Sequence, residues 1–375
     1  MSSDTSLEKK YTFQNSYIKD YSKFKKDLLN KNVIPHQVEF QAPPRGKKIC
    51  WMECPYCYGL SAENNGDRLK KDRGLEILNQ IIKGGVNKII FAGYATDPLN
   101  CDYIDDLLEM TINNQAIFGF NTKILKVSDK FVKLIDSKKL AVGSYMSLSI
   151  DAGSNETYKK IHNIKSTAPI YDRVLNNVRK IGSVRKVNKN FDLSAAYLVN
   201  IHSAKAEDYE NFIKNFIDAG CNLLRFTFPQ PPKDITTEKG VIPTPDEKNE
   251  YKEKIQKLIL KYKNDECPII IVDADEEYNI YNKPQTLPCY ARYIYPTVGF
   301  DGWLYNCSQS SSPNFRDTAL GDLNKEDFWK LYYNYQVDDF NSYSKKCNVA
   351  IQNSGCRCDR KEHIVNSDLG KKLEF

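Results

Sequence analysis

Apolar runs and helical patterns alternate along the chain between about residues 47 and 230. Continuous or alternating apolar runs predict strands, whereas apolar residues spaced i, i+3, i+4 and i+7 predict the buried face of a helix. Strands are predicted at residues 48–50, 88–92, 118–125, 144–150, 193–199 and 223–228. Helices are predicted at residues 74–82, 103–112, from 129 onwards with Ser128 as N-cap, 155–162, 171–181 and 209–217. Six β-α repeats in series predict an α/β protein with a parallel sheet and helices outside it.

Two segments flank this repeat. Residues 1–45 are polar, and Pro35 breaks their weak helical pattern, so a short helix and an extended lead-in at residues 37–40 are expected. A charged helix at 246–263 and an apolar run at 268–272 follow the repeat, and we interpret them as a bridge. We therefore divide the chain into an N-terminal extension (1–45), the βα-repeat domain (46–235), the bridge (236–285) and a C-terminal domain (286–375).

The composition is that of a globular protein, with 41% hydrophobic and 27% charged residues. The net charge of +6 comes mostly from Lys scattered along predicted helices, which makes a nucleic-acid partner an unfavoured interpretation. Residues 1–14 lack the apolar core of a secretory signal, and no apolar run approaches the ~18 residues of a membrane span. We therefore expect a cytoplasmic protein without a membrane partner. In that reducing compartment eleven cysteines indicate ligation or catalysis rather than disulfides.

Three of these cysteines, Cys50, Cys54 and Cys57, stand in the spacing C-x3-C-x2-C. Three thiolates so close together are able to hold a metal ion or an iron–sulfur cluster. On a four-iron cluster they leave one iron open, since the next cysteine is Cys101, and an open position distinguishes a catalytic site from a closed structural one. A zinc knuckle or buried free thiols are the alternatives. Zinc knuckles usually pair two short Cys or Cys/His elements, and no His is near this triplet.

The triplet, with Tyr56 as the aromatic residue before its last cysteine, resembles the signature C-x3-C-x-aromatic-C of the radical S-adenosylmethionine (radical SAM) enzymes. The resemblance implies a partial (β/α)6 barrel whose chemistry lies at the C-terminal ends of the strands. It also implies that the open iron binds the amino and carboxylate groups of SAM, and that one electron cleaves SAM to methionine and a 5′-deoxyadenosyl radical. A flavodoxin- or ferredoxin-type protein is the implied electron donor.

The resemblance further implies SAM-binding residues after two of the strands. Gly93, Thr96 and Asp97 stand where the family has Gly-Gly-Glu-Pro, here with one glycine and a carboxylate one carbon shorter. A simpler interpretation makes Asp97 the N-cap of a strand-to-helix turn. Ser149 and Asp151 match a Ser-x-Asp of family members that carry auxiliary clusters, although Asp151 also stands where the next helix begins.

Tyr56 and Asn121, the latter at the end of the third strand, complete the implied cofactor contacts. Arg225 on the sixth strand is the candidate for holding the SAM carboxylate or an anionic group of the substrate, because its planar fork suits such groups. Cys221, at the opposite end of the same strand, is expected to be structural. The four histidines are scattered, and we interpret all of them as surface or helix-capping residues.

A second cysteine pattern, C-x12-G-x4-C, comprises Cys289, Gly302 and Cys307. Apolar residues 294–300 and 303–305 flank the turn pair Asp301-Gly302, which predicts a hairpin. Because the chain reverses at this turn, the two thiols are expected to come near each other.

This pattern resembles the opening of the auxiliary-cluster domains of radical SAM enzymes, called SPASM in the long form and twitch in the short form. The number of remaining cysteines implies one auxiliary four-iron cluster, completed by two of Cys347, Cys356 and Cys358. Nearness favours Cys356 and Cys358. A structural zinc at the same thiolates is the alternative.

We therefore predict a radical SAM enzyme that abstracts a hydrogen atom from a small carbohydrate-like metabolite, in an oxidation, epimerisation or rearrangement. Maturation of a ribosomally made peptide is the alternative within the family. Only about 45 residues precede the triplet, fewer than usually fold as a separate leader-binding domain, which favours the metabolite. The competing interpretation from another class is a zinc-binding protein that docks nucleic acid, slightly supported by the basic charge and 24 Tyr residues.

Overall fold

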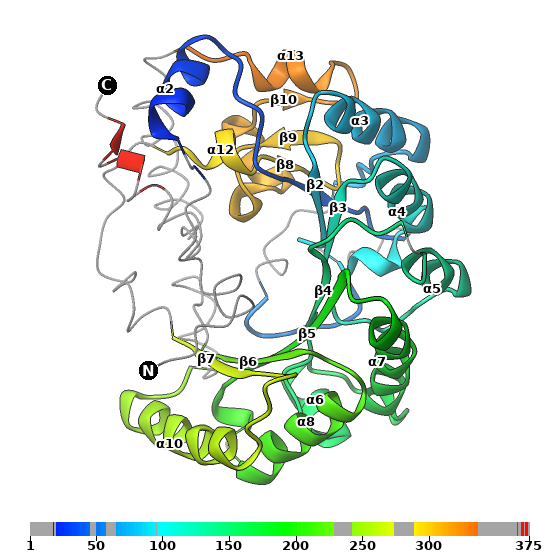
Figure 1. Ribbon diagram of the computed structural model, residues 1–375, viewed down its shortest axis with the longest axis vertical. Coiled ribbons are helices and arrows are strands. Elements are labelled where there is room, and N and C mark those ends of the chain that lie inside the picture. Colours follow the sequence, from blue (N-terminus) through cyan, green and yellow to red (C-terminus); the bar gives the residue numbers. More distant parts are fainter. Residues whose placement is uncertain are drawn as a thin grey trace.

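The computed structural model describes residues 18–373, apart from residues 19, 46–49, 58–64, 95, 138, 204, 229–241, 274–288, 337–365, 367–368 and 371. The centre of the described structure is one ten-stranded sheet in the order β10-β9-β8-β1-β2-β3-β4-β5-β6-β7. The sheet curves around the middle of the molecule, with helices α3, α4, α5, α7, α8 and α10 along its outer side (Figure 1).

Seven strands run parallel and follow chain order across the sheet. They are β1 (Val38–Gln41), β2 (Lys88–Ala92), β3 (Ile117–Thr122), β4 (Ser144–Ser149), β5 (Phe191–Leu198), β6 (Leu223–Thr227) and β7 (Ile269–Val272). On the other side of β1, β8 (Thr297–Val298) pairs in parallel, and β9 (Trp303–Tyr305) and β10 (Gly321–Asp322) follow antiparallel. The predicted α/β class with a large parallel sheet is confirmed, and the C-terminal hairpin extends the same sheet.

The outer helices connect successive strands. They are α3 (Lys71–Lys83), α4 (Ile104–Asn113), α5 (Asp129–Ile135), α6 (Asn155–Ile161), α7 (Ile170–Val187), α8 (Ala206–Asp218) and α10 (Pro245–Lys261). Ser128 caps α5 as predicted, because its side chain accepts a hydrogen bond from Phe131 N at 2.9 Å. Gly220 follows α8 with φ +96°, a conformation that glycine adopts without strain.

The first strand differs from the prediction. Residues 48–49 of the strand expected at 48–50 lie outside the described part, and Cys50 is not in a strand. The first strand is β1, in the segment that we assigned to an extended lead-in; its Phe40 is completely buried and pairs in register with Phe91 of β2. Val38 and Phe40 alternate with Glu39 and Gln41, which is a strand pattern, but it is only four residues long.

The apolar run of the bridge is likewise part of the sheet. Residues 269–272 form β7, which pairs in parallel with β6 from Leu224 to Thr227. The sheet therefore contains a seventh parallel strand beyond the six that were predicted for the barrel.

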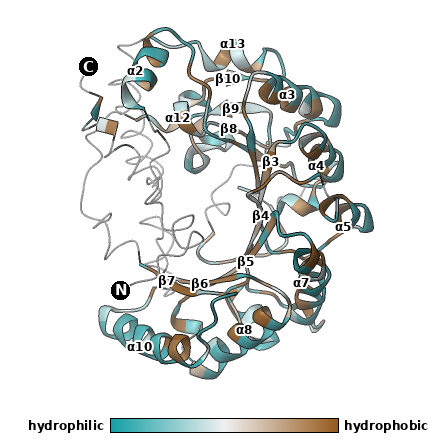
Figure 2. Cartoon of the chain, in the orientation of Figure 1, coloured by the Kyte–Doolittle hydropathy of each residue, from teal (hydrophilic) through white to brown (hydrophobic). Residues whose placement is uncertain are grey.

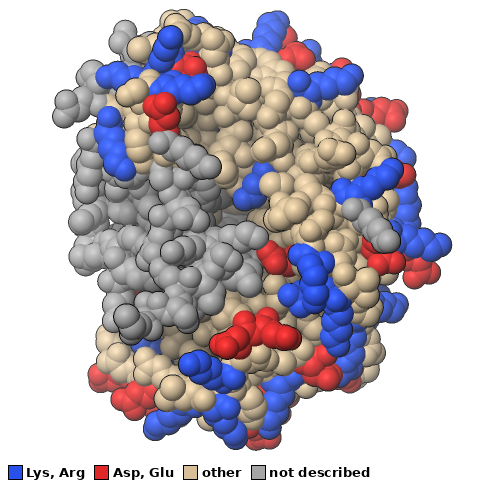
Figure 3. Space-filling view, in the orientation of Figure 1, with Lys and Arg blue, Asp and Glu red and all other residues tan. Residues whose placement is uncertain are grey.

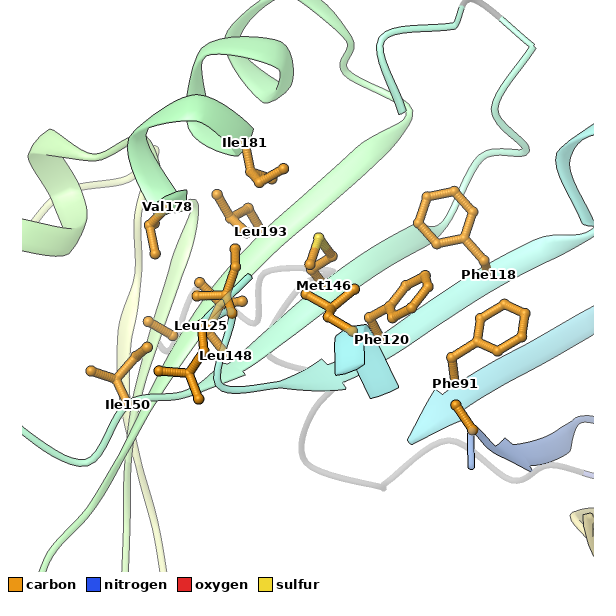
Figure 4. Close-up of a cluster of buried hydrophobic side chains, with 14 of the residues drawn as sticks. Phe91, Phe118, Phe120, Leu125, Met146, Leu148, Ile150, Val178, Ile181 and Leu193 are labelled. Carbon is orange, nitrogen blue, oxygen red and sulfur yellow. The ribbon is translucent and has the colours of Figure 1, made fainter. Parts of the chain in front are cut away.

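The main hydrophobic core lies between the sheet and its outer helices. A row of completely buried partners in register crosses this face: Phe40, Phe91, Phe120, Met146 and Leu193. Val178 and Ile181 of α7 pack on this row from outside (Figure 4). Figure 2 shows the matching pattern, with hydrophobic strands and hydrophilic outward sides on α3, α4 and α10. Each such side chain contributes roughly 1.5–3 kcal/mol to folding when it is buried. The apolar residues therefore determine which face of the sheet packs against the outer helices.

A second hydrophobic cluster, named the C-terminal cluster here, lies beside the hairpin. Its buried members are Leu28, Val33, Cys289, Tyr290, Ala291, Tyr293, Ile294, Tyr295, Cys307, Tyr335, Leu369 and Leu373. Helix α2 (Tyr21–Leu29) contributes Leu28, whose carbonyl oxygen accepts a hydrogen bond from Tyr335 Oη at 2.8 Å. The N-terminal helix, predicted as part of an extension, thus covers the region that holds two of the C-terminal cysteines.

The charged side chains are distributed as the sequence suggested. On the face shown in Figure 3, Lys and Arg are interspersed with Asp and Glu over the described surface. None of the helices in the described ranges combines the length and the hydropathy that a membrane crossing requires.

Candidate metal and cofactor site

The cysteine triplet lies in a loop shortly after β1, at the end of the sheet where parallel strands finish. Cys54 is buried, Cys50 and Cys57 are half-buried, and all three are free thiols. Cys57 N donates a hydrogen bond to Cys54 O at 3.0 Å, which closes a turn. Burial raises the pKa of Cys54 to about 12 and also raises the pKa of Cys50, and in both cases a nearby Cys57 thiolate adds to the increase. The three sulfur atoms therefore lie close enough to sense one another's charge.

The donor set fits a cluster better than a single ion. Among the described residues no three His, Cys, Asp or Glu side chains surround one point as ligands of one metal ion. A four-iron cluster takes each thiolate on a different iron, so its thiols do not converge on one point. Three free sulfurs in one partly exposed loop match that requirement, whereas a closed zinc site needs four ligands around a single centre.

A buried network of charged and polar groups backs the loop. Tyr56 Oη donates to Asp151 Oδ2 at 2.9 Å, and Lys123 Nζ lies 3.1 Å from the same oxygen and 3.2 Å from Ser149 O. Asp151 Oδ1 accepts from Leu198 N at 2.9 Å. Burial alone would raise the pKa of Asp151, but the Lys123 ammonium and the other donors outweigh it, so the pKa lies below its usual range. Tyr56 is thereby fixed between two cysteines, and the network includes the predicted residues Asp151 and Ser149.

Asp151 is not the residue at which helix α6 begins. Its φ of +66° is unusual for a residue other than glycine, and α6 starts four residues later with Ser154 as its N-cap. The strained backbone turns the carboxylate toward Tyr56 and Lys123, which offsets the conformational cost.

Asp97 serves as a cap and a brace. Its carboxylate accepts hydrogen bonds from Leu99 N at 2.9 Å, Thr122 Oγ1 at 2.8 Å and Lys123 N at 2.5 Å. The simpler interpretation from the sequence, an N-cap, is thus present, here on the short 3-10 helix Pro98–Asn100. Burial raises the pKa of Asp97 despite these donors. Asp97 joins the end of β2 to the end of β3 beside the cysteine loop.

Gly93 and Thr96 form the turn that precedes Asp97. A Cβ atom on Gly93 would stand 1.3 Å from the carbonyl oxygen of Thr96, so only glycine permits this backbone approach. Thr96 is buried, and Asn100 Nδ2 lies 3.4 Å from its Oγ1. The SAM contacts predicted for Gly93, Thr96 and Asp97 stay predictions.

His162 corrects our interpretation of the histidines. It does stand at the C-cap of α6, but it is completely buried, with Nδ1 at 3.2 Å from both Cys54 Sγ and Tyr56 Oη. Burial and the nearby Lys123 ammonium lower the pKa of His162 to about 3, so the ring is neutral. A histidine distant in sequence from the triplet is therefore in contact with one of its thiols.

The inner face of the sheet carries polar side chains beside apolar ones such as Ile90, Leu223 and Ile270. Opposite the core, in-register partners on this face include Asn121 with Ser147, Ser149 with Ala196, Ala196 with Arg225 and Glu39 with Thr297. Arg225 Nη2 donates to Ser147 Oγ at 2.8 Å, two strands away. The predicted residues Asn121, Ser149 and Arg225 thus lie on one face, which the cysteine loop borders at the strand ends.

Two further buried thiols lie at the opposite end of the strands. Cys221 precedes β6, its N–H donates to Phe216 O at 3.0 Å, and burial raises its pKa well above the usual value. Cys267 precedes β7 and is also buried. Both are packed at the N-terminal edge, as expected for a structural Cys221.

The C-terminal cysteines are placed only in part. Cys289 and Cys307 are both buried in the C-terminal cluster. The predicted hairpin is present, with Gly302 at φ +80°, although Ile294 ends helix α12 (Ala291–Ile294) and does not begin a strand. Cys347, Cys356 and Cys358 lie outside the described residues.

Sequence reasoning missed Lys123 and His162. Lys123 follows the predicted Asn-Thr pair at the end of β3, and its contacts to Asp151 and His162 arise only because neighbouring strands end together. His162 reaches the loop because α6 folds back over it. Only a tertiary arrangement carries this information, since neither residue belongs to a spacing motif.

Comparison with known proteins agrees with this geometry. Residues 47–193 match the family model of the Radical SAM superfamily. An S-adenosylmethionine-dependent nucleotide dehydratase from Flammeovirga pacifica is 25% identical over 179 residues, which cover 44% of this chain and 58% of that protein's length.

Two crystal structures of Streptococcus suis SuiB share the fold. SuiB bound to precursor peptide SuiA has a TM-score of 0.60 at 15% identity, over 84% of this chain and 68% of SuiB. SuiB bound to S-adenosylmethionine has a TM-score of 0.59 at 15% identity, over 86% of this chain and 69% of SuiB. Residues 47–193, which contain the cysteine triplet, therefore form a domain of the radical SAM superfamily, and the curved parallel sheet shares the fold of SuiB.

Proposed function

We propose that this SAM-dependent enzyme abstracts a hydrogen atom from a small carbohydrate-like metabolite that carries an anionic group, such as a sugar acid or a nucleotide. Cys50, Cys54 and Cys57 are the ligands of the SAM-binding cluster, which supplies the electron that cleaves SAM when it is bound. The proposed SAM contacts are Tyr56, Gly93, Thr96, Asp97, Asn121, Ser149 and Asp151. A flavodoxin- or ferredoxin-type protein is the proposed electron donor.

The polar groups of the inner face are the observation that supports this substrate class most. They are the amide of Asn121, the hydroxyl of Ser147, a single arginine on β6 and a carboxylate, Glu39, on β1. Hydroxyl-rich molecules are recognised by such hydrogen-bonding groups, and a guanidinium suits a carboxylate or phosphate. The Flammeovirga pacifica relative, a nucleotide dehydratase by name, agrees with a sugar-containing anion.

Arg225 is the residue proposed to bind the anionic group. Its guanidinium is half-buried on the inner face and is held from one side by Ser147. A partly desolvated guanidinium forms charge-assisted hydrogen bonds, which are roughly twice as strong as neutral ones. Arg225 therefore orients the substrate below the SAM-binding loop without taking part in the electron transfer.

We further propose one auxiliary four-iron cluster in the C-terminal region. Two of the ligands of this four-iron cluster are Cys289 and Cys307, which are both buried in the hydrophobic C-terminal cluster. Two of Cys347, Cys356 and Cys358 complete the ligand set. This cluster either accepts an electron from the substrate radical or anchors the substrate.

A peptide substrate is the second candidate. The solved structure of SuiB bound to its precursor peptide, with the same fold, favours it. The match of residues 47–193 to the radical SAM superfamily weighs against the zinc-binding alternative.

The proposal is tested with anaerobically reconstituted, dithionite-reduced protein and SAM. Sugar acids, nucleotides and short peptides are added separately, and release of 5′-deoxyadenosine is measured. A substrate deuterated at its carbon atoms should transfer deuterium into 5′-deoxyadenosine. Stimulation by peptides alone would contradict the metabolite proposal, and zinc in place of iron would contradict the enzyme class.

Arg225→Met is the matched variant, with Arg179→Met as control because Arg179 lies on the outer helix α7. Arg225→Met should keep the slow release of 5′-deoxyadenosine without substrate and lose most of the substrate-stimulated rate. Equal stimulation in both variants would remove Arg225 from the proposal.

A further inference from the structure

His162 stands against the cysteine loop from the side of α6. His162 O accepts a hydrogen bond from Glu53 N at 3.4 Å, and Asn163 Nδ2 lies 3.3 Å from Glu53 Oε2. The imidazole packs edge-on against Tyr158, with ring centroids 4.4 Å apart. The end of α6 thus fixes both the loop backbone and the orientation of the His162 ring.

Each ring nitrogen of His162 has two polar neighbours. Nδ1 lies 3.2 Å from Cys54 Sγ and 3.2 Å from Tyr56 Oη. Tyr56 directs its proton to Asp151, so toward Nδ1 its oxygen is an acceptor only. Nε2 lies 3.2 Å from Ile150 O, which only accepts, and 3.4 Å from Lys123 Nζ, which only donates.

These neighbours allow two tautomers of the neutral ring, each suited to one state of Cys54. When Cys54 is a free thiol, Nε2–H donates a hydrogen bond to Ile150 O, and Nδ1 accepts a hydrogen bond from the thiol S–H. With a thiolate ligand, that arrangement would point the Nδ1 lone pair at the sulfur. The other tautomer places Nδ1–H on the sulfur and lets Lys123 donate to Nε2. Ile150 O loses its ring donor in this tautomer. One neutral hydrogen bond is thus replaced by two charge-assisted ones, which are roughly twice as strong.

We propose that His162, in the enzyme with its SAM-binding cluster, carries its proton on Nδ1 and donates a hydrogen bond to the Cys54 sulfur, with Lys123 enforcing this tautomer. This inference rests on the proposed ligand role of Cys54. Hydrogen bonds to the sulfurs of an iron–sulfur cluster stabilise the reduced state and so raise the reduction potential. His162 is thus a positioning residue that makes the cluster easier to reduce.

The first test compares His162→Leu and His162→Asn with the wild-type protein in redox titrations followed by electron paramagnetic resonance. Asn offers an amide N–H near the position of Nδ1, whereas Leu offers none. At the wild-type midpoint, the ratio of reduced to oxidised cluster should fall about tenfold in His162→Leu and much less in His162→Asn. The Cys50/Cys54/Cys57→Ala variant identifies any signal that comes from another cluster. An unchanged or higher potential in His162→Leu would overturn the proposal.

The second test needs no folded variant of His162. Wild-type protein with 15N-labelled histidine should show a weak nitrogen coupling to the reduced cluster, transmitted through the Nδ1–H···S hydrogen bond. Absence of this coupling would overturn the inference while leaving the proposed function intact. A protein that takes up no iron at the triplet would instead overturn the proposed function, and this inference with it.

Discussion

The two cysteine regions of this chain differ in what surrounds their sulfurs. The Cys50–Cys57 loop is backed by Tyr56, Lys123, Asp151 and His162, which are joined by hydrogen bonds and an ion pair. Among the described residues, the pair Cys289 and Cys307 lies with tyrosines and aliphatic side chains, with Asn366 Nδ2 at 3.6 Å from Cys289 and Ser310 Oγ at 3.5 Å from Cys307. The buried Arg292 lies over the rings of Tyr293 and Tyr335 in the same region. The first region thus has a buried ion pair beside its sulfurs, whereas the described neighbours of the second pair are mainly aromatic and aliphatic. Cysteine spacing alone does not reveal this difference.

The largest expected difference between the two cysteine regions comes from removing one thiol from each of them. Cys54→Ala should abolish release of 5′-deoxyadenosine, because the SAM-binding cluster loses a ligand. Cys307→Ala should lose roughly half of the bound iron and keep slow SAM cleavage without substrate. Product analysis by chromatography and iron determination measure both effects. If Cys307→Ala also stopped SAM cleavage, the two regions would not be independent.

Removing the Lys123 charge beside the Cys50–Cys57 loop should lower the free energy of unfolding. Lys123→Met leaves the carboxylate of Asp151, whose side chain is 5% exposed, without its cation, at a cost of about 3–5 kcal/mol. The control Lys130→Met removes solvent-exposed ion pairs with Asp106 and Glu109 and should change stability by at most about 1 kcal/mol. Urea unfolding of the metal-free protein gives both values. Equal effects would mean that the buried network is not stabilising.

The two regions should also differ in how much stability is lost when a glycine is replaced by alanine. In Gly93→Ala the new Cβ meets the backbone oxygen of Thr96, and the turn must shift, so we expect a loss of about 3 kcal/mol. In Gly302→Ala the Cβ meets the side chain of Asn324, 2.5 Å away, which can move, and the positive φ adds about 1 kcal/mol. Thermal unfolding distinguishes the two, and a larger loss for Gly302→Ala would contradict this ranking.

The smallest expected difference between the two regions is in how stability depends on pH in acid. Asp151 is buried, but Lys123 lowers its pKa below the unfolded value of 3.8, so its stabilisation is present above that value and is lost as the pH falls through the folded pKa. Asp322 near the hairpin also has a lowered pKa, since Lys325 outweighs its partial burial, but its partner is exposed. Below about pH 4, Asp151→Asn should flatten the pH dependence of the unfolding free energy more than Asp322→Asn does. Equal slopes in denaturant unfolding at several pH values would contradict this.

The sequence predicted those parts of the fold that depend on local pattern. Strands β2 to β6 and their helices repeat apolar residues at regular spacing, and the cysteine spacing marked the loop. Strand β1 was assigned only to an extended lead-in, because its alternation of apolar and polar residues is four residues long. Lys123 and His162 were missed because their roles come from contacts between β3, α6 and the loop, which no spacing within one segment encodes.

The position of β1 has a consequence for how the chain folds as it is synthesised. One side of β1 pairs with β2, which follows soon after it, but the other side pairs with β8, so Glu39 meets Thr297 only when most of the chain exists. Until then a strand at the centre of the final sheet is an open edge, and open edges are templates for wrong pairing. Long-range pairings of this kind also slow folding. A fragment that begins at residue 47 would lack this strand and would leave β2 and β8 without their common neighbour.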